Sequence, residues 1–200
     1  SQIPYEVIIA DDGSDKKTKK IIDDFSDQSK LKIIHSFQED KGFRAAKSRN
    51  RAISKALSEY IILVDGDMIL HPSFIYDHKK YAQENCFVQG GRVLLSEEKT
   101  EEVLASNMIS YNFLSKDLKN RKNAIHSNFL SKLFSTKKNF LRGIKTCNVS
   151  FYRKDCISVN GFNNNFEGWG REDTEFFARL MNAGIKRKTL KFNAIQYHLW

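Results

Sequence analysis

Three pairs of acidic residues are the side chains in this 200-residue sequence whose types and spacing best suit chemistry. They are Asp11 and Asp12, Asp65 and Asp67, and Glu172 and Asp173. Carboxylates bind divalent cations, accept hydrogen bonds from hydroxyl groups and act as general bases. The three pairs therefore indicate metal binding or proton transfer.

Asp65 and Asp67 flank Gly66 directly after an apolar run. Hard oxygen ligands at this spacing suit Mg²⁺ or Mn²⁺, which take one or two protein carboxylates and fill their other positions with phosphate oxygens and water. Asp-Gly is also a common turn dipeptide, so a metal site and a polar turn are both open interpretations. Asp11 and Asp12 have the same ambiguity, because the glycine and serine that follow them indicate a turn and a helix cap.

Glu172 and Asp173 follow the segment Gly168-Trp169-Gly170. Acidic residues in a first helical turn stabilise the helix dipole by about 0.3–1 kcal/mol without any further role. That interpretation leaves the indole between two glycines unexplained. An indole in such a loop can stack on the apolar face of a sugar or a base, which favours a binding site.

The expected second helix, over 43–57, has basic residues near its start. Arg44, Lys47 and Arg49 suit a diphosphate there, because a helix N-terminus also supplies amide donors; a solvated basic face is the alternative. His198 is a lone histidine near the end of the sequence. Four further histidines show no partner pattern: His35, His71, His78 and His126.

The elements that must position these residues alternate between strand and helix. Uninterrupted β-favouring runs predict buried strands over 7–10, 31–34 and 60–64, with helices over 14–25, where Ser14 is the cap, and 43–57. This order predicts a doubly wound α/β fold with a parallel sheet. Ligands of such folds bind beyond the carboxyl ends of the strands, which is where the first two acidic pairs lie.

The second half of the sequence is less regular. Thr146–Tyr152 alternates as a half-buried strand does, and a helix is expected from Arg171 to Ala183, ended by Gly184. Lys188–Phe192 is the expected last strand.

Composition limits the class of partner. The net charge of +9 favours an anionic partner, and residues 115–145 concentrate basic side chains interleaved with Phe and Leu. The three cysteines form no CxxC pair, which fits a reducing compartment, and no apolar run approaches the roughly 20 residues of a membrane span. We therefore expect a cytoplasmic chain with peripheral contact to the inner face of an anionic membrane.

Taken together, the motifs resemble inverting family 2 glycosyltransferases of the GT-A fold, a Rossmann-like, mostly parallel sheet flanked by helices. The matching segments are 7–14, 42–50, 63–67, 161–162 and 168–173. The last of these is similar to the acceptor-side motif of β-1,4-galactosyltransferases and bacterial chondroitin-type polymerases. The order and spacing of the five segments are more specific for this family than any single segment is.

The resemblance implies a UDP-sugar donor and a saccharide or lipid-linked saccharide acceptor. Asp11 and Asp12 are implied to contact the uracil or ribose, Asp65 the ribose, and Arg49 the donor nucleotide. The implied metal ligands are Asp67 and His198, holding Mn²⁺ or Mg²⁺.

On the acceptor side, the resemblance implies Asp173 as the general base and Glu172 as the residue that orients the acceptor hydroxyl. Trp169 and Gly170 are implied to contact the acceptor.

The resemblance also implies a single domain, with a nucleotide-sugar half (1–95), a basic variable segment (96–145) and an acceptor half (146–200). The family begins with a strand that contacts the nucleotide, and the resemblance here starts at the second strand, so we expect either that the chain is a fragment or that its first strand is replaced. We therefore expect an exposed sheet edge that favours self-association.

Other classes remain as alternatives. A phosphoacceptor receiver domain has acids at positions like Asp11, Asp12 and Asp65, but that class does not explain residues 168–173. A phosphoryl-transfer hydrolase with Asp65 as nucleophile would usually have a hydroxyl residue close behind. A nucleic-acid binder rests on the net charge and on the basic stretch interleaved with aromatic residues, but this charge lies outside the expected strands, and no nucleic-acid partner is expected. Dinucleotide and Walker-type motifs do not occur in the sequence.

Overall fold

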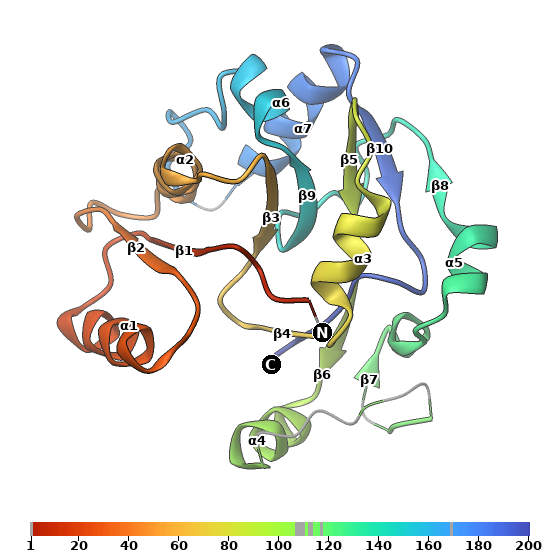
Figure 1. The fold of residues 1–200 in the computed structure, drawn as a ribbon, viewed down its shortest axis with the longest axis horizontal. Coiled ribbons are helices and arrows are strands. Elements are labelled where there is room, and N and C mark those ends of the chain that lie inside the picture. The colour runs from red at the N-terminus through yellow and green to blue at the C-terminus, as the bar shows by residue number, and fades with distance from the viewer. Residues whose placement is uncertain (1, 107–110, 112–113, 117, 169) are drawn as a thin grey trace. The chain divides into compact units, whose positions relative to one another are not determined.

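The computed structural model describes residues 2–106, 111, 114–116, 118–168 and 170–200. These residues form two compact units, each built from segments distant in the sequence. Unit 1 contains mainly Ile62–Phe151 and Lys186–Trp200, and unit 2 contains Ile3–Ile61 and Tyr152–Ile185. Figure 1 labels the helices and strands of both.

Unit 2 is built around a pair of parallel strands, with one helix between them in the sequence and three after them. Its elements are β1 (Val7–Asp11), α1 (Lys16–Gln28), β2 (Ile33–Phe37), α2 (Ala45–Lys55), α6 (Arg153–Ser158) and α7 (Glu172–Asn182). β1 and β2 pair in register from Val7 with Ile33 to Asp11 with Phe37, so both strands end at the same edge. The predicted βαβ beginning of the fold is confirmed, but the expected burial is wrong, because β1 and β2 are mostly half-buried.

Three boundaries in unit 2 differ from those expected. The cap of α1 is Asp15, whose carboxylate accepts a hydrogen bond from the Thr18 amide at 2.9 Å, and not Ser14. β2 runs to Phe37 because its pairing with β1 continues to the end of that strand. α2 begins at Ala45, because the backbone of the preceding residue, Arg44, is not helical (φ −129°, ψ 49°); its amide donates to Asp12.

α7 ends where the glycine predicted it. Gly184 has a φ of +87°, which a residue with a Cβ adopts only under strain, and its amide donates to the Met181 carbonyl. The helix is held by its buried face, where Phe176 stacks on Phe162 with 4.0 Å between ring centroids.

Unit 1 contains two sheets with strand orders β3-β9-β5-β10-β8 and β4-β11-β6-β7. The strands are β3 (Tyr60–Val64), β4 (Met68–Leu70), β5 (Cys86–Gln89), β6 (Gly91–Leu95), β7 (Leu118–Lys119), β8 (Thr136–Lys137), β9 (Asn148–Tyr152), β10 (Lys186–Thr189) and β11 (Ile195–His198). The helices are α3 (Phe74–Tyr81), α4 (Glu97–Ser106), η1 (Arg121–Ala124) and α5 (Asn128–Phe134). β3 has the bounds expected from its apolar run.

The sheets are mixed in direction. β10 pairs with β5 and β11 with β6 in parallel, as the α/β class predicts. Antiparallel pairings of β4 with β11, β9 with β5, β7 with β6 and β8 with β10 are added to these, so both sheets of unit 1 combine the two directions.

Two expectations for the later strands are wrong. Residues 148–151 of β9 are buried on both faces instead of half-buried, because this strand lies inside the five-stranded sheet. The expected last strand at 188–192 is β10, which ends at Thr189. A turn with positive φ at Phe192 and Ala194 then leads into β11, which the sequence analysis did not foresee.

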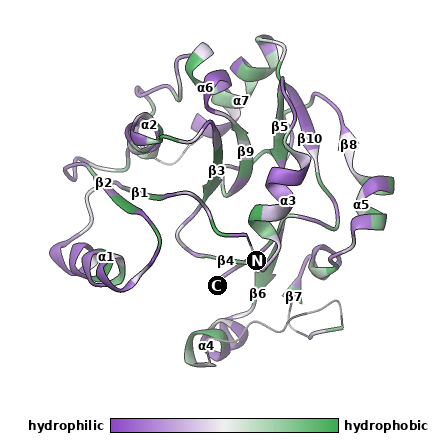
Figure 2. Cartoon of the chain, viewed as in Figure 1, coloured by the Kyte–Doolittle hydropathy of each residue, from purple (hydrophilic) through white to green (hydrophobic). Residues whose placement is uncertain are grey.

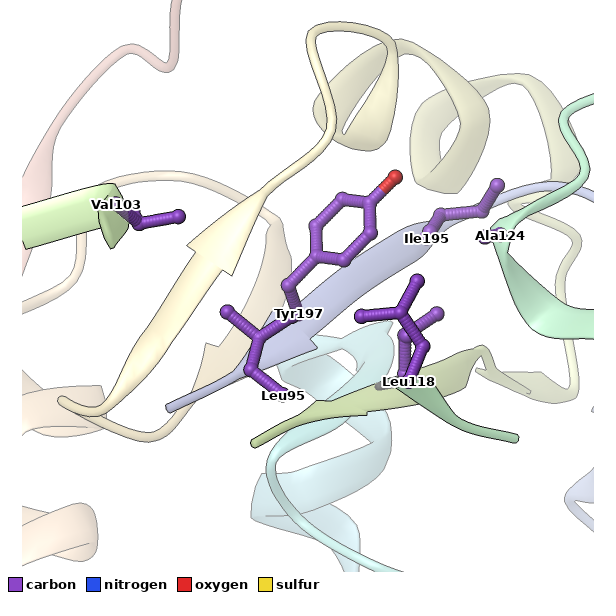
Figure 3. Close-up of a cluster of buried hydrophobic side chains, with 7 residues drawn as sticks. Leu95, Val103, Leu118, Ala124, Ile195 and Tyr197 are labelled. Carbon is purple, nitrogen blue, oxygen red and sulfur yellow. The ribbon is translucent and has the colours of Figure 1, made fainter. Parts of the chain in front are cut away.

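The smaller sheet encloses its own core. Figure 3 shows side chains of β6, β11 and neighbouring elements packed together. The buried members are Val93, Leu95, Val103, Leu118, Ala124, Ile195 and Tyr197. In Figure 2, β5 is mostly hydrophobic, whereas β10 and most of α1 are hydrophilic. None of the helices in the described part of the chain is both long and apolar enough to cross a membrane.

His78 of α3 is a wholly buried histidine with two hydrogen-bond partners in β9. Its Nδ1 lies 2.7 Å from Ser150 Oγ and its Nε2 lies 2.9 Å from Asn148 Oδ1. Burial lowers the pKa of His78 to about 4, although the Asn148 hydrogen bond and the charge of Asp77 act in the opposite direction.

We expect His78 to make the protein less stable in acid. Below its ordinary pKa of 6.5, His78 takes up a proton when unfolded but stays neutral when folded until about pH 4. The free energy of unfolding therefore falls as pH is lowered through this window, by up to about 1.4 kcal/mol per pH unit from this group. Urea unfolding at several pH values measures the slope, and His78→Gln should show a shallower one. Equal slopes in the two proteins would contradict this assignment.

Candidate functional site

In unit 1, the pairing of β4 with β11 brings Asp67 and His198 together. His198 is paired with Met68, the residue after Asp67, and the Leu199 amide donates to the Asp67 carbonyl at 3.0 Å. His198 Nε2 consequently lies 3.3 Å from Asp67 Oδ2, with both side chains partly open to solvent. Two residues far apart in the sequence thus form one accessible pair.

The pair fits a divalent cation by its donor chemistry. A carboxylate oxygen suits Mg²⁺ and Mn²⁺, and an imidazole nitrogen suits a transition-metal ion better than Mg²⁺. Across the residues that the structure describes, no group of three or more His, Cys, Asp or Glu side chains could hold an ion. The protein would therefore supply two ligands and leave the other positions to substrate and water, as is usual for these ions at phosphate sites.

Asp65 and Gly66 lie beside this pair in the sequence. Burial raises the pKa of the Cys147 thiol and the charge of Asp65 raises it further, which places Asp65 near that buried thiol. A Cβ added at Gly66 would have no atom within 4 Å. The glycine is therefore not required by packing, and the backbone between the two aspartates is open to a ligand.

In unit 2, Asp11 is held in the turn after β1. Its Oδ1 accepts hydrogen bonds from the amides of Gly13 and Ser14 at 3.1 and 2.8 Å, and its Oδ2 lies 2.7 Å from His35 Nε2. Burial alone would raise the pKa of Asp11, but the hydrogen bonds from Ser14 and His35 outweigh it and hold the pKa below its usual value. Asp11 is thus an ionised, largely buried group that shapes the turn.

Asp12 links the end of β1 to the start of α2. Its Oδ1 accepts a hydrogen bond from Gln38 Nε2 at 2.5 Å, and its Oδ2 accepts one from the Arg44 backbone amide. Each oxygen retains a lone pair, so a further hydrogen bond to a ligand is compatible with this arrangement. The predicted contact with a nucleotide remains a prediction.

Arg49 of α2 is placed against the acidic pair at the start of α7. Its Nη1 lies 3.0 Å from Glu172 Oε1 and 3.1 Å from Asp173 Oδ1, and all three side chains are largely removed from solvent. One guanidinium therefore compensates both carboxylates and fixes their relative position. The predicted contact between Arg49 and a donor nucleotide is not tested by this arrangement.

The neighbouring Asn50 anchors the loop that leads to the acidic pair. Its side chain accepts a hydrogen bond from the Phe162 amide at 2.8 Å and donates to the Phe162 carbonyl and to Asn164 Oδ1 at 2.7 and 2.8 Å. Gly161 is required here, because a Cβ would lie 2.5 Å from Asn50 Oδ1. At the far end of the loop, the Gly168 amide donates to the Phe43 carbonyl at 2.8 Å. Asn50 within α2 and Phe43, two residues before α2, thus hold the two ends of the loop.

Two predicted acceptor contacts lie in this loop. Trp169 is outside the residues that the structure describes. Gly170 is described, and a Cβ added to it would have no atom within 4 Å. Asp65, Asp67 and His198 belong to unit 1 and the other predicted site residues to unit 2, so the prediction that the acidic strand ends face one crevice stays a prediction.

Three residues that organise the candidate site were not foreseen: His35, Gln38 and Asn50. His35 lies in the middle of β2, paired with Ile9 of β1, and Gln38 directly follows β2; parallel pairing of adjacent strands was the available signal. The histidines are also less isolated than their spacing indicated, since His71 stacks on His126 with 4.6 Å between ring centroids and His126 lies 3.0 Å from Asp77.

We expect Arg49→Gln to lower the free energy of unfolding by about 1–3 kcal/mol, because Glu172 and Asp173 lose charge-assisted hydrogen bonds and repel one another. Urea unfolding measures the change. Arg51→Gln, an exposed arginine of the same helix, is the matched control and should change stability little. Similar losses in the two variants would show that Arg49 does not act through the acidic pair.

Comparison with solved structures defines the class of protein. The chain superposes on GalNAc-T7, solved with UDP, GalNAc and Mn²⁺, with a TM-score of 0.65 and 12% sequence identity, covering 98% of this chain and 38% of that one. The expected fold class is therefore confirmed as the α/β fold of GT-A glycosyltransferases. The sequence profile of glycosyl transferase family 2 matches residues 1–152, and the chain belongs to that family.

A second profile, described as the N-terminal domain of galactosyltransferase, matches residues 130–199. Among curated proteins, chondroitin synthase of Escherichia coli is 26% identical over 97% of this chain and 30% of its own length. Hyaluronan synthase of Pasteurella multocida is 27% identical over 98% of this chain and 21% of its own length. The chain thus spans less than a third of these relatives. Family membership confirms the resemblance and sets aside the receiver-domain and nucleic-acid interpretations.

Proposed function

We propose that this glycosyltransferase chain transfers a sugar from a UDP-sugar to an acceptor hydroxyl, with inversion and with dependence on Mn²⁺ or Mg²⁺. The pairing of Asp67 with His198 is the observation that carries this proposal. Asp67 lies in the segment matched by the family 2 profile, and His198 lies in the segment matched by the galactosyltransferase profile. That GalNAc-T7 was solved with UDP and Mn²⁺ also supports it.

Donor activation is assigned to Asp67 and His198. The departing nucleoside diphosphate gains negative charge as the bond to the sugar breaks, and a divalent cation held by these side chains would neutralise that charge. Asp12, Asp11 and Asp65 are assigned to the uracil and ribose. Arg49 is assigned to the donor nucleotide in addition to the acidic pair that it contacts.

Acceptor activation is assigned to Asp173, which takes the proton of the acceptor hydroxyl as the oxygen attacks the anomeric carbon. Glu172 orients that hydroxyl, and Trp169 and Gly170 contact the acceptor. Arg49 holds both carboxylates in place. A single displacement from the face opposite the leaving group inverts the anomeric centre, as in inverting glycoside hydrolysis.

The proposed acceptor is a saccharide or lipid-linked saccharide, and the proposed process is polysaccharide biosynthesis. The names of the two synthases that the chain resembles support this choice. The same proposal includes three further points. The chain is divided into a donor half, a basic segment and an acceptor half; it is located at the inner face of a membrane; and it self-associates through a sheet edge.

A nucleotide screen tests the donor class. We expect UDP to raise the thermal unfolding temperature in the presence of Mn²⁺ and to have a much smaller effect with the metal chelated. GDP, ATP and a short DNA duplex, each with and without Mn²⁺, are the comparison. Stabilisation by another nucleotide, or by UDP without regard to the metal, would contradict the proposal.

The basic segment is expected to attach the chain to anionic membranes. Phe129 and Leu133 of α5 are exposed beside basic side chains such as Lys132. Each basic residue near an anionic surface contributes about 1 kcal/mol. In vesicle flotation, binding should increase with phosphatidylserine content and decrease with salt. Binding that is independent of both would exclude this contact.

A further inference from the structure

A second cluster of basic, amide and aromatic side chains lies in unit 1, where η1 and the end of α5 adjoin the turn between β10 and β11. These elements enclose a pocket of about 700 Å³. Its lining includes the cations Arg121, Lys122 and Lys191, and no acidic side chain among the described lining residues. A pocket of this size takes a small molecule or a few residues of a polymer, and its charge selects an anion.

Two lysines and two asparagines of this pocket retain polar atoms that bind no other described residue. Asn123 Nδ2 donates to the Arg92 carbonyl at 2.9 Å, which fixes the orientation of the amide and leaves Oδ1 available. Within the part of the chain that the structure describes, Lys122 and Lys191 form no ion pair and the Asn120 side chain makes no hydrogen bond. The pocket thus offers a pre-oriented acceptor, an amide and two ammonium groups.

Aromatic rings complete the pocket. Phe134 and Phe192 meet edge to face with 5.7 Å between ring centroids. Phe192 has a φ of +62°, which is unusual for a residue with a bulky side chain, and its carbonyl accepts a hydrogen bond from the Ser127 amide at 2.9 Å. Backbone strain of this kind is concentrated at ligand sites, because the surrounding structure must maintain it.

We propose that this pocket binds an anionic saccharide, as a subsite for the glycan on which the enzyme acts. The inference rests on the proposed function for the source of the glycan, and on the pocket for its chemistry. Ammonium groups pair with carboxylate or sulfate, amides hydrogen-bond hydroxyls, and phenylalanine rings pack against the apolar face of a pyranose. A free phosphate would fill only a small part of the pocket, and a neutral saccharide would leave the lysines unpaired.

Calorimetry with two hexasaccharides tests the subsite. The acidic probe alternates glucuronate with N-acetylglucosamine, and the neutral probe is a chitin hexasaccharide. The wild-type chain should bind the acidic probe more tightly, and the double variant Lys122→Gln/Lys191→Gln should weaken that binding by about tenfold. The control is Lys16→Gln/Lys20→Gln on α1, which removes the same charge from exposed positions of unit 2 and should leave affinity within about twofold.

UDP affinity with Mn²⁺ is measured on the same proteins. Failure of the subsite proposal can therefore be distinguished from failure of the proposed function. Equal affinity of the wild type and the Lys122→Gln/Lys191→Gln variant for the acidic probe would overturn the subsite, since binding would then occur elsewhere. Equal affinity for acidic and neutral probes would also overturn it, as would tighter, lysine-dependent binding of a DNA hexanucleotide. Absence of Mn²⁺-dependent UDP binding in the wild type would instead contradict the proposed function.

Discussion

Asp173→Asn is expected to lower the rate of sugar transfer by about 10²–10⁴-fold while leaving the affinity for UDP nearly unchanged. The amide keeps the size and much of the hydrogen bonding of the carboxylate, but it cannot accept a proton from the acceptor hydroxyl. Arg49 also remains in contact with Glu172, so the start of α7 keeps one of its two ion pairs. The measurement is UDP release with acceptor present, together with UDP affinity in its absence.

Glu175→Gln is the matched control for this variant. Glu175 lies in the same first turn of α7, but its carboxylate pairs with Arg179 and has no proposed chemical role. If the acids of this turn only stabilise the helix dipole, both variants should lose up to about 1 kcal/mol of stability with little effect on turnover. Near-normal turnover in Asp173→Asn would remove Asp173 as the base and leave Glu172 as the next candidate.

Asp67→Ala is expected to abolish the dependence of UDP binding on Mn²⁺ and to weaken Mn²⁺ binding by at least about 100-fold. Loss of an outer-shell partner of a metal ligand already costs 10–100-fold in metal affinity, so loss of a ligand should cost at least as much. The diphosphate of UDP would then bind with its charge uncompensated. Calorimetry with and without Mn²⁺ measures both effects.

Two further variants make this result specific. His198→Ala should have an effect in the same direction, because its imidazole lies 3.3 Å from the Asp67 carboxylate. Asp27→Ala removes an equal charge from an exposed position of α1 and should have none. Unchanged UDP affinity and unchanged Mn²⁺ dependence in Asp67→Ala would show that Asp67 is only a turn residue.

Local sequence predicted the helices and strands whose physical cause lies within a single segment. The apolar runs that form β1 and β3 predict strands because their residues favour an extended backbone, although the expected full burial is wrong: most of these residues are half-buried, and Ala10 and Val64 are exposed. The α7 helix was foreseen from its acidic first turn and its terminal glycine, which act within a few residues. The same local motifs were sufficient to indicate the α/β class and the glycosyltransferase family.

Local sequence was a poor guide where packing overrides residue type. β10 reads Lys-Arg-Lys-Thr, a pattern typical of an exposed segment, but it lies inside the five-stranded sheet. It is accommodated there because the buried Arg187 donates from Nη1 to the carbonyls of Phe140 and Arg142 at 3.0 and 2.9 Å. Burial lowers the pKa of Arg187, and these carbonyls compensate its charge.

The sequence by itself therefore determined the strands that end in acids, the helix that begins with them, and the family of enzyme. Only the tertiary structure decided which of these residues meet. His198 reaches Asp67 through the register of β4 against β11, and Arg49 reaches Glu172 and Asp173 through the packing of α2. Such contacts join segments distant in the chain, and no local preference encodes them, because their free energy is gained only when both segments are already folded.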